Sequence, residues 1–186
     1  MALKKNRVVL VTGGSRGVGK GTAIALGATG ATVYVSGRSS SDGQTTALPG
    51  NIHTTAEEIT ARGGNGIAVI CDHTDDQQIA ALIDQIIDEQ GRIDILVNNV
   101  FQVPDDMLEW QPFWKRPLDD HWQAMIDLGL RAHYVASYYA APHMIKQAAG
   151  MIVNISSPGA RCYLHSVIYG VGKAGKDKMM HDMAKE

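Results

Sequence analysis

The segment VVLVTGGSRGVGKGT, residues 8–22, constrains the fold of this chain more than any other. An apolar run rich in Val leads into a Gly-rich turn, and a segment of helical length rich in Ala follows. A turn between a buried strand and a helix binds phosphate through free backbone N–H groups and the positive end of the helix dipole. The segment therefore predicts a nucleotide-binding α/β fold.

Two phosphate-binding motifs fit this turn. Counted from Gly14, the turn resembles the P-loop of ATPases and GTPases, with Gly and Lys at positions 19 and 20. That motif requires Ser or Thr directly after the lysine to hold Mg²⁺, whereas this chain has Gly21. Counted from Thr12, the turn is T-G-x-x-x-G-x-G, which is typical of dinucleotide sites. We favour the dinucleotide site and keep the P-loop as the weaker alternative.

In a dinucleotide site each glycine has its own role. Gly13 permits a tight turn out of the strand, Gly17 lets the backbone approach the pyrophosphate, and Gly19 permits close packing of the helix. We predict that the turn binds the cofactor through Gly13, Ser15, Arg16, Gly17, Val18 and Gly19.

The end of the second apolar run indicates which dinucleotide binds. Sites that prefer NAD usually carry Asp or Glu there for the ribose hydroxyls, whereas this chain has VSGRSS with Arg38. Arg16 lies within the turn itself. Guanidinium groups bind phosphate through charge-assisted, often bidentate hydrogen bonds. The two arginines therefore predict NADP(H) as the cofactor in preference to NAD(H).

Apolar runs and helical segments alternate along the chain. Five runs are nearly continuous rather than alternating, as in parallel strands buried on both faces, and they cover residues 8–12, 32–36, 67–71, 93–98 and 151–156. Helices are expected over 17–29, 75–90, 119–148 with a kink at Pro142, and 169–185, with a long connection over 39–53. This order predicts a single α/β domain over 1–186, a Rossmann-like, doubly wound parallel sheet.

A second group of residues carries the chemistry. Tyr169 and Lys173 are four residues apart, so they share one face of a helix. A nearby lysine cation favours the phenolate of a tyrosine, which can then exchange a proton with a carbonyl or alcohol oxygen during hydride transfer. Ser157 or Ser156, at the end of the preceding strand, can bind and orient the same oxygen.

The motifs TGGSRGVG, CDHTD, ILVNNV, VNISS and YGVGK together resemble the short-chain dehydrogenase/reductase family over essentially the whole chain. Within it, ISSPG, YGVGKAGKDK and FWKRPLDDHW resemble the dehydrogenase/reductase member 1 subgroup, whose members reduce carbonyls with NADPH. The resemblance implies an oxidoreductase with Ser157, Tyr169 and Lys173 as its catalytic set, and Ser157 in preference to Ser156. It also implies that Asp72 contacts the adenine, Asn98 the adenosine ribose side, and Lys173 the nicotinamide ribose.

The chain departs from the family pattern in three places. NNVF replaces the usual NNAG, so Val100 and Phe101 narrow the floor near the nicotinamide. Gly129 replaces an Asn that commonly holds a water for proton relay. The family also continues with further strands after the helix in which this sequence ends, so the C-terminal strands are expected to be missing. Gly129 and the missing C-terminal strands motivate the alternative of a degenerate relative that binds NADPH without turnover.

An aromatic segment and two helices bear on substrate and assembly. Phe101, Trp110, Phe113 and Trp114 are candidates to line a pocket for an apolar carbonyl or alcohol, or to pack the loop against a helix or a partner. The resemblance implies a homodimer or homotetramer through the helices at 119–148 and 169–185. Adaptable contacts there would come from Met179, Met180, Met183, Tyr134, Tyr138 and Tyr139.

Composition excludes other classes of protein. A net charge of −2 over 186 residues gives no basic surface for nucleic acid. The two cysteines, Cys71 and Cys162, fit a reducing cytoplasm, and no His or Cys spacing predicts a metal site. The N-terminal MALKKNR leads into too short an apolar run for a leader peptide, and no apolar run is long enough to span a membrane.

Overall fold

The computed structural model describes residues 7–45 and 48–186. Its strands form one parallel sheet. Residues 1–6, on which the prediction about a leader peptide rests, lie outside the described residues. The strand order is β3-β2-β1-β4-β5, as expected of a doubly wound fold. The strands are β1 (Val8–Thr12), β2 (Thr32–Gly37), β3 (Asn65–Ile70), β4 (Ile95–Asn98) and β5 (Met151–Asn154).

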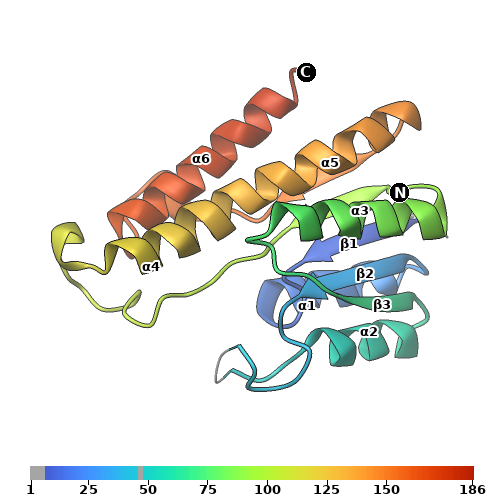
Figure 1. Ribbon diagram of the computed structural model, residues 1–186, viewed down its shortest axis with the longest axis horizontal. Helices are drawn as coiled ribbons and strands as arrows, with labels where there is room; N and C mark the ends of the chain where they lie inside the picture. The colour runs from blue at the N-terminus through green and yellow to red at the C-terminus, as the bar shows by residue number, and fades with distance from the viewer. Residues whose placement is uncertain (1–6, 46–47) are drawn as a thin grey trace.

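Helices connect these strands and cover both faces of the sheet (Figure 1). They are α1 (Gly17–Gly27), α2 (Ile52–Ala61), α3 (Asp76–Gln90), α4 (Leu118–Trp122), the π-helix η2 (Gln123–Arg131), α5 (Ala132–Lys146) and α6 (Val167–Met183). Short 3₁₀ turns are η1 (Phe113–Lys115) and η3 (Pro158–Ala160). Among the described residues, no helix combines the length and the apolar character needed to cross a membrane.

The two faces of the sheet form separate apolar cores because successive strand residues point to opposite sides. On one face, Val9 and Val11 of β1 pack with side chains of α1 and α2. On the other face, Val8 and Leu10 pack with side chains of α3, η2 and α5. Burial on both faces explains why the strand runs are continuously apolar. The predicted fold class is therefore confirmed.

The observed elements differ from the predicted ones in several places. Helix α2 was not predicted: a long connection was expected over residues 39–53, and no element was assigned to the residues between it and the third apolar run. Two features of the sequence mark this helix. Asn51 is its N-cap, with a side chain that accepts from the Thr54 N–H, and Ile52 and Ile59 are buried on the same helical face. Strand β3 begins at Asn65, before its apolar run, because it pairs there with Thr32 of β2.

The helix predicted over 119–148 is not interrupted at Pro142, where a kink was expected. Helix α5 continues through Pro142 as far as Lys146. The departure from α-helical geometry lies earlier, in the π-helix η2, which contains Gly129. Local π-geometry commonly occurs at functional sites, where it redirects side chains on either side of it. The sequence carries no equally direct signal for this feature.

A glycine contact between β3 and α2 gives a stability prediction. A Cβ added to Gly66 would lie 2.1 Å from the carbonyl oxygen of Ala56, so Gly66→Ala forces two backbones apart. We expect it to lower the free energy of unfolding by about 1–3 kcal/mol in urea titrations.

Gly21→Ala is the matched control, because a Cβ at this exposed position of α1 meets no atom within 4 Å. We expect this variant to gain about 0.5–1 kcal/mol from helix propensity. Equal effects of the two substitutions would contradict the close approach of α2 to β3.

Candidate functional site

The Gly-rich turn lies where the carboxyl ends of three strands meet. The Gly13 N–H donates to the Ser36 carbonyl at the end of β2, over 2.8 Å. Thr12 Oγ1 at the end of β1 accepts from the backbone N–H groups of Asn99 and Val100 just beyond β4, over 3.0 and 3.2 Å. In parallel sheets, ligands bind in the crevice outside this edge.

Each glycine of the turn has a distinct environment. Gly13 has φ +66°, and a Cβ there would lie 2.6 Å from the Val100 Cα, so a side chain is excluded. Gly17 has φ +55° and has no atom within 4 Å of its Cβ position, which leaves the backbone open to a ligand. Gly19 packs so closely that a Cβ would lie 2.4 Å from the Gly13 carbonyl oxygen. The space left beside Gly17 is suited to a pyrophosphate.

Arg16 ties the turn to the connection after β2. Its guanidinium donates to the carbonyl oxygens of Gly50 and Pro49 and to Ser39 Oγ, over 2.6, 3.3 and 3.2 Å. Ser15 beside it is buried, whereas Val18 on α1 is exposed. Arg16 therefore lies next to the segment that follows the second strand.

Lys20 has a separate role that bears on the P-loop alternative. Its Nζ forms an ion pair of 2.6 Å with Glu58 of α2. A P-loop lysine must reach the phosphates with its ammonium group. The pairing with a carboxylate on the neighbouring helix gives Lys20 a structural function and weighs against that alternative.

Arg38 and Asp72 meet across the ends of β2 and β3. The Arg38 guanidinium lies 3.7 Å from the Asp72 carboxylate and also donates to Gln102 Oε1 over 3.3 Å. Burial alone would raise the pKa of Asp72, but hydrogen bonds from Thr74 and the charge of Arg38 hold this pKa below its usual value. Asp72 is therefore ionised, and Arg38, whose side chain is about half exposed, has its charge at the surface.

The structure does not bring Asn98 to the Gly-rich turn. Asn98 is 0% exposed, and its Nδ2 donates to Asn154 Oδ1, Ser137 Oγ and the His133 carbonyl oxygen, over 2.8, 3.0 and 3.3 Å. It joins β4 to β5 and α5. The neighbouring Asn99 instead donates to the carbonyl oxygens of Thr12 and Gly13. The motif ILVNNV did not single out Asn99, although this residue lies directly beside Asn98.

Tyr169 and Ser157 meet directly. The Tyr169 hydroxyl donates to Ser157 Oγ over 2.8 Å, although the two residues lie on different elements. Ser166 caps α6 by accepting from the Tyr169 N–H, so the tyrosine lies in the first turn of that helix. The ring packs on Gly159, where a Cβ would lie 2.5 Å from the Tyr169 Cε1. Ser156, by contrast, has a buried hydroxyl without a hydrogen-bond partner among the described residues.

Lys173 completes this group. It is buried, and its Nζ lies 5.4 Å from the centroid of the Tyr169 ring and 4.5 Å from that of Phe101. Phe101 in turn packs edge-on against Tyr169, with centroids 6.1 Å apart. Gly129 faces the Phe101 ring, because a Cβ at position 129 would lie 3.7 Å from the Phe101 Cδ2. Phe101 thus fills the space beside Gly129, next to the lysine.

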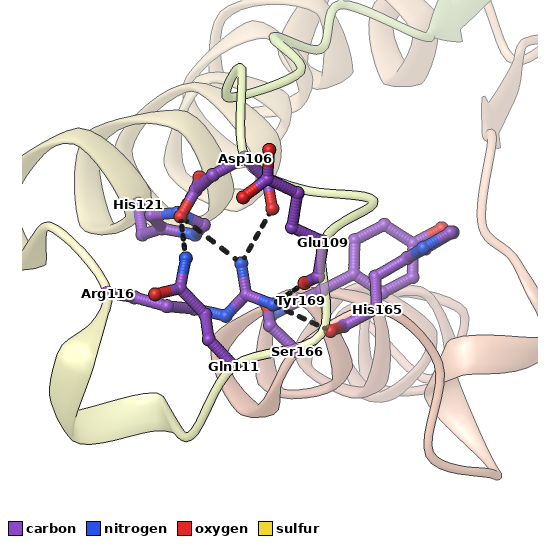
Figure 2. Close-up of polar contacts among 8 residues, drawn as sticks. All are labelled: Asp106, Glu109, Gln111, Arg116, His121, His165, Ser166 and Tyr169. Atoms are coloured by element: carbon purple, nitrogen blue, oxygen red, sulfur yellow. Dashed lines mark hydrogen bonds and ion pairs between the residues drawn. The ribbon is translucent and has the colours of Figure 1, made fainter.

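A polar cluster around Arg116 supports the segment before the tyrosine (Figure 2). The buried Arg116 guanidinium donates to the carbonyl oxygens of Asp106, Glu109 and His165, over 3.0, 2.6 and 3.3 Å, and pairs with the Asp106 carboxylate. His121 also hydrogen-bonds this carboxylate. The His165 ring packs on Tyr169 with centroids 5.0 Å apart. The cluster therefore fixes the loop after β4 to the residues that flank the tyrosine.

The predicted aromatic pocket is only partly assembled. A groove of about 350 Å³ is lined by Phe113 and Trp114, with Arg116 and side chains from α4 and the start of α6. Phe113 and Trp114 pack edge-to-face, with centroids 5.2 Å apart. Trp110 is exposed and lies outside this groove, and Phe101 lies against Tyr169 instead. The groove is apolar and borders the Arg116 cluster. Within 7–45 and 48–186, no group of three His, Cys, Asp or Glu residues is arranged to hold a metal.

Comparison with known proteins extends these observations. The family model described as short chain dehydrogenase matches residues 7–186. The human dehydrogenase/reductase SDR family member 1 is 38% identical over 183 residues, which are 97% of this chain and 55% of that protein. A 3-oxoacyl-[acyl-carrier-protein] reductase of Synechocystis is 36% identical over 181 residues, 97% of this chain and 68% of that protein.

Solved structures of short-chain oxidoreductases share the fold of this chain. A metagenomic short-chain oxidoreductase in complex with NADP superimposes with a TM-score of 0.81 at 30% identity, covering 96% of this chain and 75% of that one. The chain thus spans about half the length of the human relative and three quarters of this structure.

The Arg116 cluster yields a second prediction. Arg116→Met removes the donor from three backbone carbonyls and leaves the Asp106 carboxylate without this cation. We expect a loss of roughly 3 kcal/mol in unfolding free energy and faster hydrogen exchange of the amides over residues 105–117 and 165–166. Lys115→Met, at the exposed neighbouring position, is the control and should leave both unchanged. Exchange rates in Arg116→Met equal to those of the control would show that the cluster does not hold this segment.

Proposed function

Because this chain belongs to the short-chain dehydrogenase family, we propose that it is an NADP(H)-dependent oxidoreductase that interconverts a carbonyl and an alcohol. Tyr169 is the proposed acid and base, Ser157 the residue that orients the substrate oxygen, and Lys173 the cation that supports the tyrosine. The observation that carries the proposal is the 2.8 Å hydrogen bond between Tyr169 and Ser157, with Lys173 buried beside them. Ser157 thus meets the tyrosine hydroxyl, and Lys173 lies 5.4 Å from the centroid of the tyrosine ring.

The arrangement supports proton transfer at the Tyr169 hydroxyl. In the reductive direction, this hydroxyl gives its proton to the carbonyl oxygen as hydride reaches the carbonyl carbon, which leaves an alcohol and a phenolate. The Lys173 ammonium, 5.4 Å from the ring centroid, stabilises the negative charge of that phenolate. Ser157 Oγ lies 2.8 Å from the Tyr169 hydroxyl, and we propose that it donates to the oxygen that the tyrosine protonates. In the oxidative direction each transfer is reversed.

The carboxyl edge of the sheet fits a dinucleotide. When bound, NADP(H) supplies or accepts the hydride. The space beside Gly17 accommodates the pyrophosphate, and Arg16 and Arg38 lie near the end of β2, where a 2′-phosphate needs cations. Asp72 and Lys173 remain proposed contacts of the cofactor, whereas the fully buried Asn98 supports the end of β4 instead of contacting the cofactor. A related oxidoreductase of known structure contains NADP, which supports the same choice.

Substrate, assembly and location are proposed from separate observations. An apolar small-molecule carbonyl or alcohol is proposed from the aromatic groove beside the Arg116 cluster. A homodimer or homotetramer is proposed from the exposed rings on α5, Tyr134, Tyr138 and Tyr139, which pack on one another. A cytoplasmic location is proposed from the two cysteines, which form no disulfide in the described residues.

Tyr169→Phe tests the chemical role. This variant keeps the ring that packs on Gly159 but has no proton to give. We expect turnover of NADPH with a panel of ketones and aldehydes to fall at least about 100-fold, whereas the thermal shift produced by NADPH persists. Tyr138→Phe, on the exposed face of α5, is the control and should keep wild-type turnover. Equal turnover in all three proteins would refute the catalytic assignment, and NADPH binding without any wild-type turnover would favour the alternative of a non-catalytic relative.

The choice of cofactor is tested separately by thermal unfolding. NADPH should raise the melting temperature more than NADH at equal concentration, since a ligand at 100 times its Kd adds ~2.7 kcal/mol. Arg38→Gln should reduce the difference between the two cofactors. Arg62→Gln, at the end of α2 and the opposite edge of the sheet, should not. A shift with NADH alone, or a shift with magnesium and ATP, would contradict the proposed cofactor.

A further inference from the structure

Phe101 is an aromatic residue beside the proposed catalytic group, and the proposed mechanism gives it no part. It follows the end of β4 by three residues and is half-buried. Its ring packs against the apolar cluster formed by Met107, Ala124, Met125 and Tyr169. The neighbours of Phe101 therefore include the tyrosine to which the reaction is assigned.

The ammonium group of Lys173 lies over the Phe101 ring. The distance from the Lys173 Nζ to the centroid of this ring is 4.5 Å, and the centroid of the Tyr169 ring is 5.4 Å away. A cation within about 6 Å of an aromatic centroid is attracted by the negative face of the ring, most strongly where water is excluded. Because Lys173 is buried, this attraction offsets part of the cost of removing its charge from water.

No carboxylate among the described residues forms an ion pair with Lys173. The next cationic side chain on α6 is Lys176, which is 1% exposed and donates through Nζ to the Ile155 carbonyl oxygen over 3.3 Å. His133, on α5, is occupied by a hydrogen bond to a backbone carbonyl oxygen just beyond β4. The face of Phe101 thus lies where a counter-ion to a buried ammonium would be expected.

Two features define the position of the Phe101 ring. It packs against the Tyr169 ring with centroids 6.1 Å apart and planes at 78°, which is the edge-to-face arrangement that aromatic pairs favour. Gly129 leaves room for it, because a Cβ at position 129 would lie 3.7 Å from the Phe101 Cδ2 and a longer side chain would compete for the same space. The ring is therefore placed relative to the tyrosine as well as to the lysine.

We propose that Phe101 is a positioning residue for the reaction at Tyr169: the face of its ring binds the Lys173 ammonium and holds this cation beside the tyrosine ring. The inference rests on the proposed function, in which that cation stabilises the phenolate. The attraction between two charges weakens with distance, so a lysine released from the ring would support the phenolate less. Phe101 thus acts on the reaction through Lys173.

Fluorinated phenylalanine at position 101 tests the proposal with little change of shape. Fluorine atoms withdraw charge from the face of the ring and weaken its attraction for a cation, while the ring keeps nearly its size. Initial rates with NADPH and a carbonyl substrate would be measured for the full chain with one, two or three fluorine atoms on this ring. Turnover should fall stepwise, by about tenfold over the series, and Phe101→Leu, which has no ring, should fall at least as far.

Tyr163→Leu, at an exposed aromatic position, is the control for the loss of a ring and should keep wild-type turnover. A ring that only filled space would tolerate fluorine atoms regardless of their number. Turnover that stays constant along the fluorinated series would therefore overturn the proposal, even if Phe101→Leu is less active.

Thermal unfolding gives a readout that does not need turnover. A wild-type protein that consumes no NADPH would refute the proposed function, and the melting temperatures would then decide the inference by themselves. Three fluorine atoms on Phe101 should lower the melting temperature by about 2–4 °C in the wild-type background but not in Lys173→Met, which has no cation for the ring to bind.

Lys178→Met removes an exposed lysine of the same helix and is the matched control. In this background the fluorinated ring should lower the melting temperature as much as in wild type. An equal loss with and without Lys173 would show that the ring acts by packing alone and would overturn the proposal.

Discussion

The parallel pairing of β1 with β2 and β4 is the constraint on which the site depends. It aligns three strand ends, so that the Gly13 N–H reaches the Ser36 carbonyl and Thr12 Oγ1 receives the N–H of Asn99. The same register continues to β5, where Asn98 pairs with Asn154, and the chain beyond β5 delivers Ser157 to Tyr169. One sheet thus positions both the proposed dinucleotide crevice and the proposed proton-transfer group.

Several side chains hold the ring of Tyr169 in place but do not contact its hydroxyl. Arg116 binds the carbonyl oxygens of Glu109 and His165, and the His165 ring packs on the tyrosine. Phe101 packs on the same tyrosine ring, and Lys173 lies over Phe101. These contacts limit the motion of the ring without using the Tyr169 oxygen, which bonds only Ser157 among the described side chains. Held in this way, the oxygen has the fixed position that the proposed proton transfer requires.

Local patterns predicted much of this arrangement, whereas contacts across the fold could not be predicted from the sequence. The Gly-rich turn and the spacing of Tyr169 and Lys173 depend on neighbours within one turn or helix, so the sequence carries them directly. Asn98 and Asn99 point to opposite sides of the sheet end, and only the sheet decides which one meets the turn. The buried state of Lys176 likewise depends on packing against β5. From the sequence alone, a lysine at that position is expected to be exposed to solvent.

Hydride transfer is the event to which the strand ends, the Gly-rich turn and Tyr169 are all assigned, and isotopic labelling follows it most directly. NADPH deuterated at C4 would be incubated with a carbonyl that the protein reduces, and the alcohol analysed by mass spectrometry and NMR. The account predicts one deuterium on the former carbonyl carbon and none exchanged with water. The NADPH would carry deuterium at both positions of C4. An alcohol that contains no deuterium would contradict direct transfer to a carbonyl held at Tyr169.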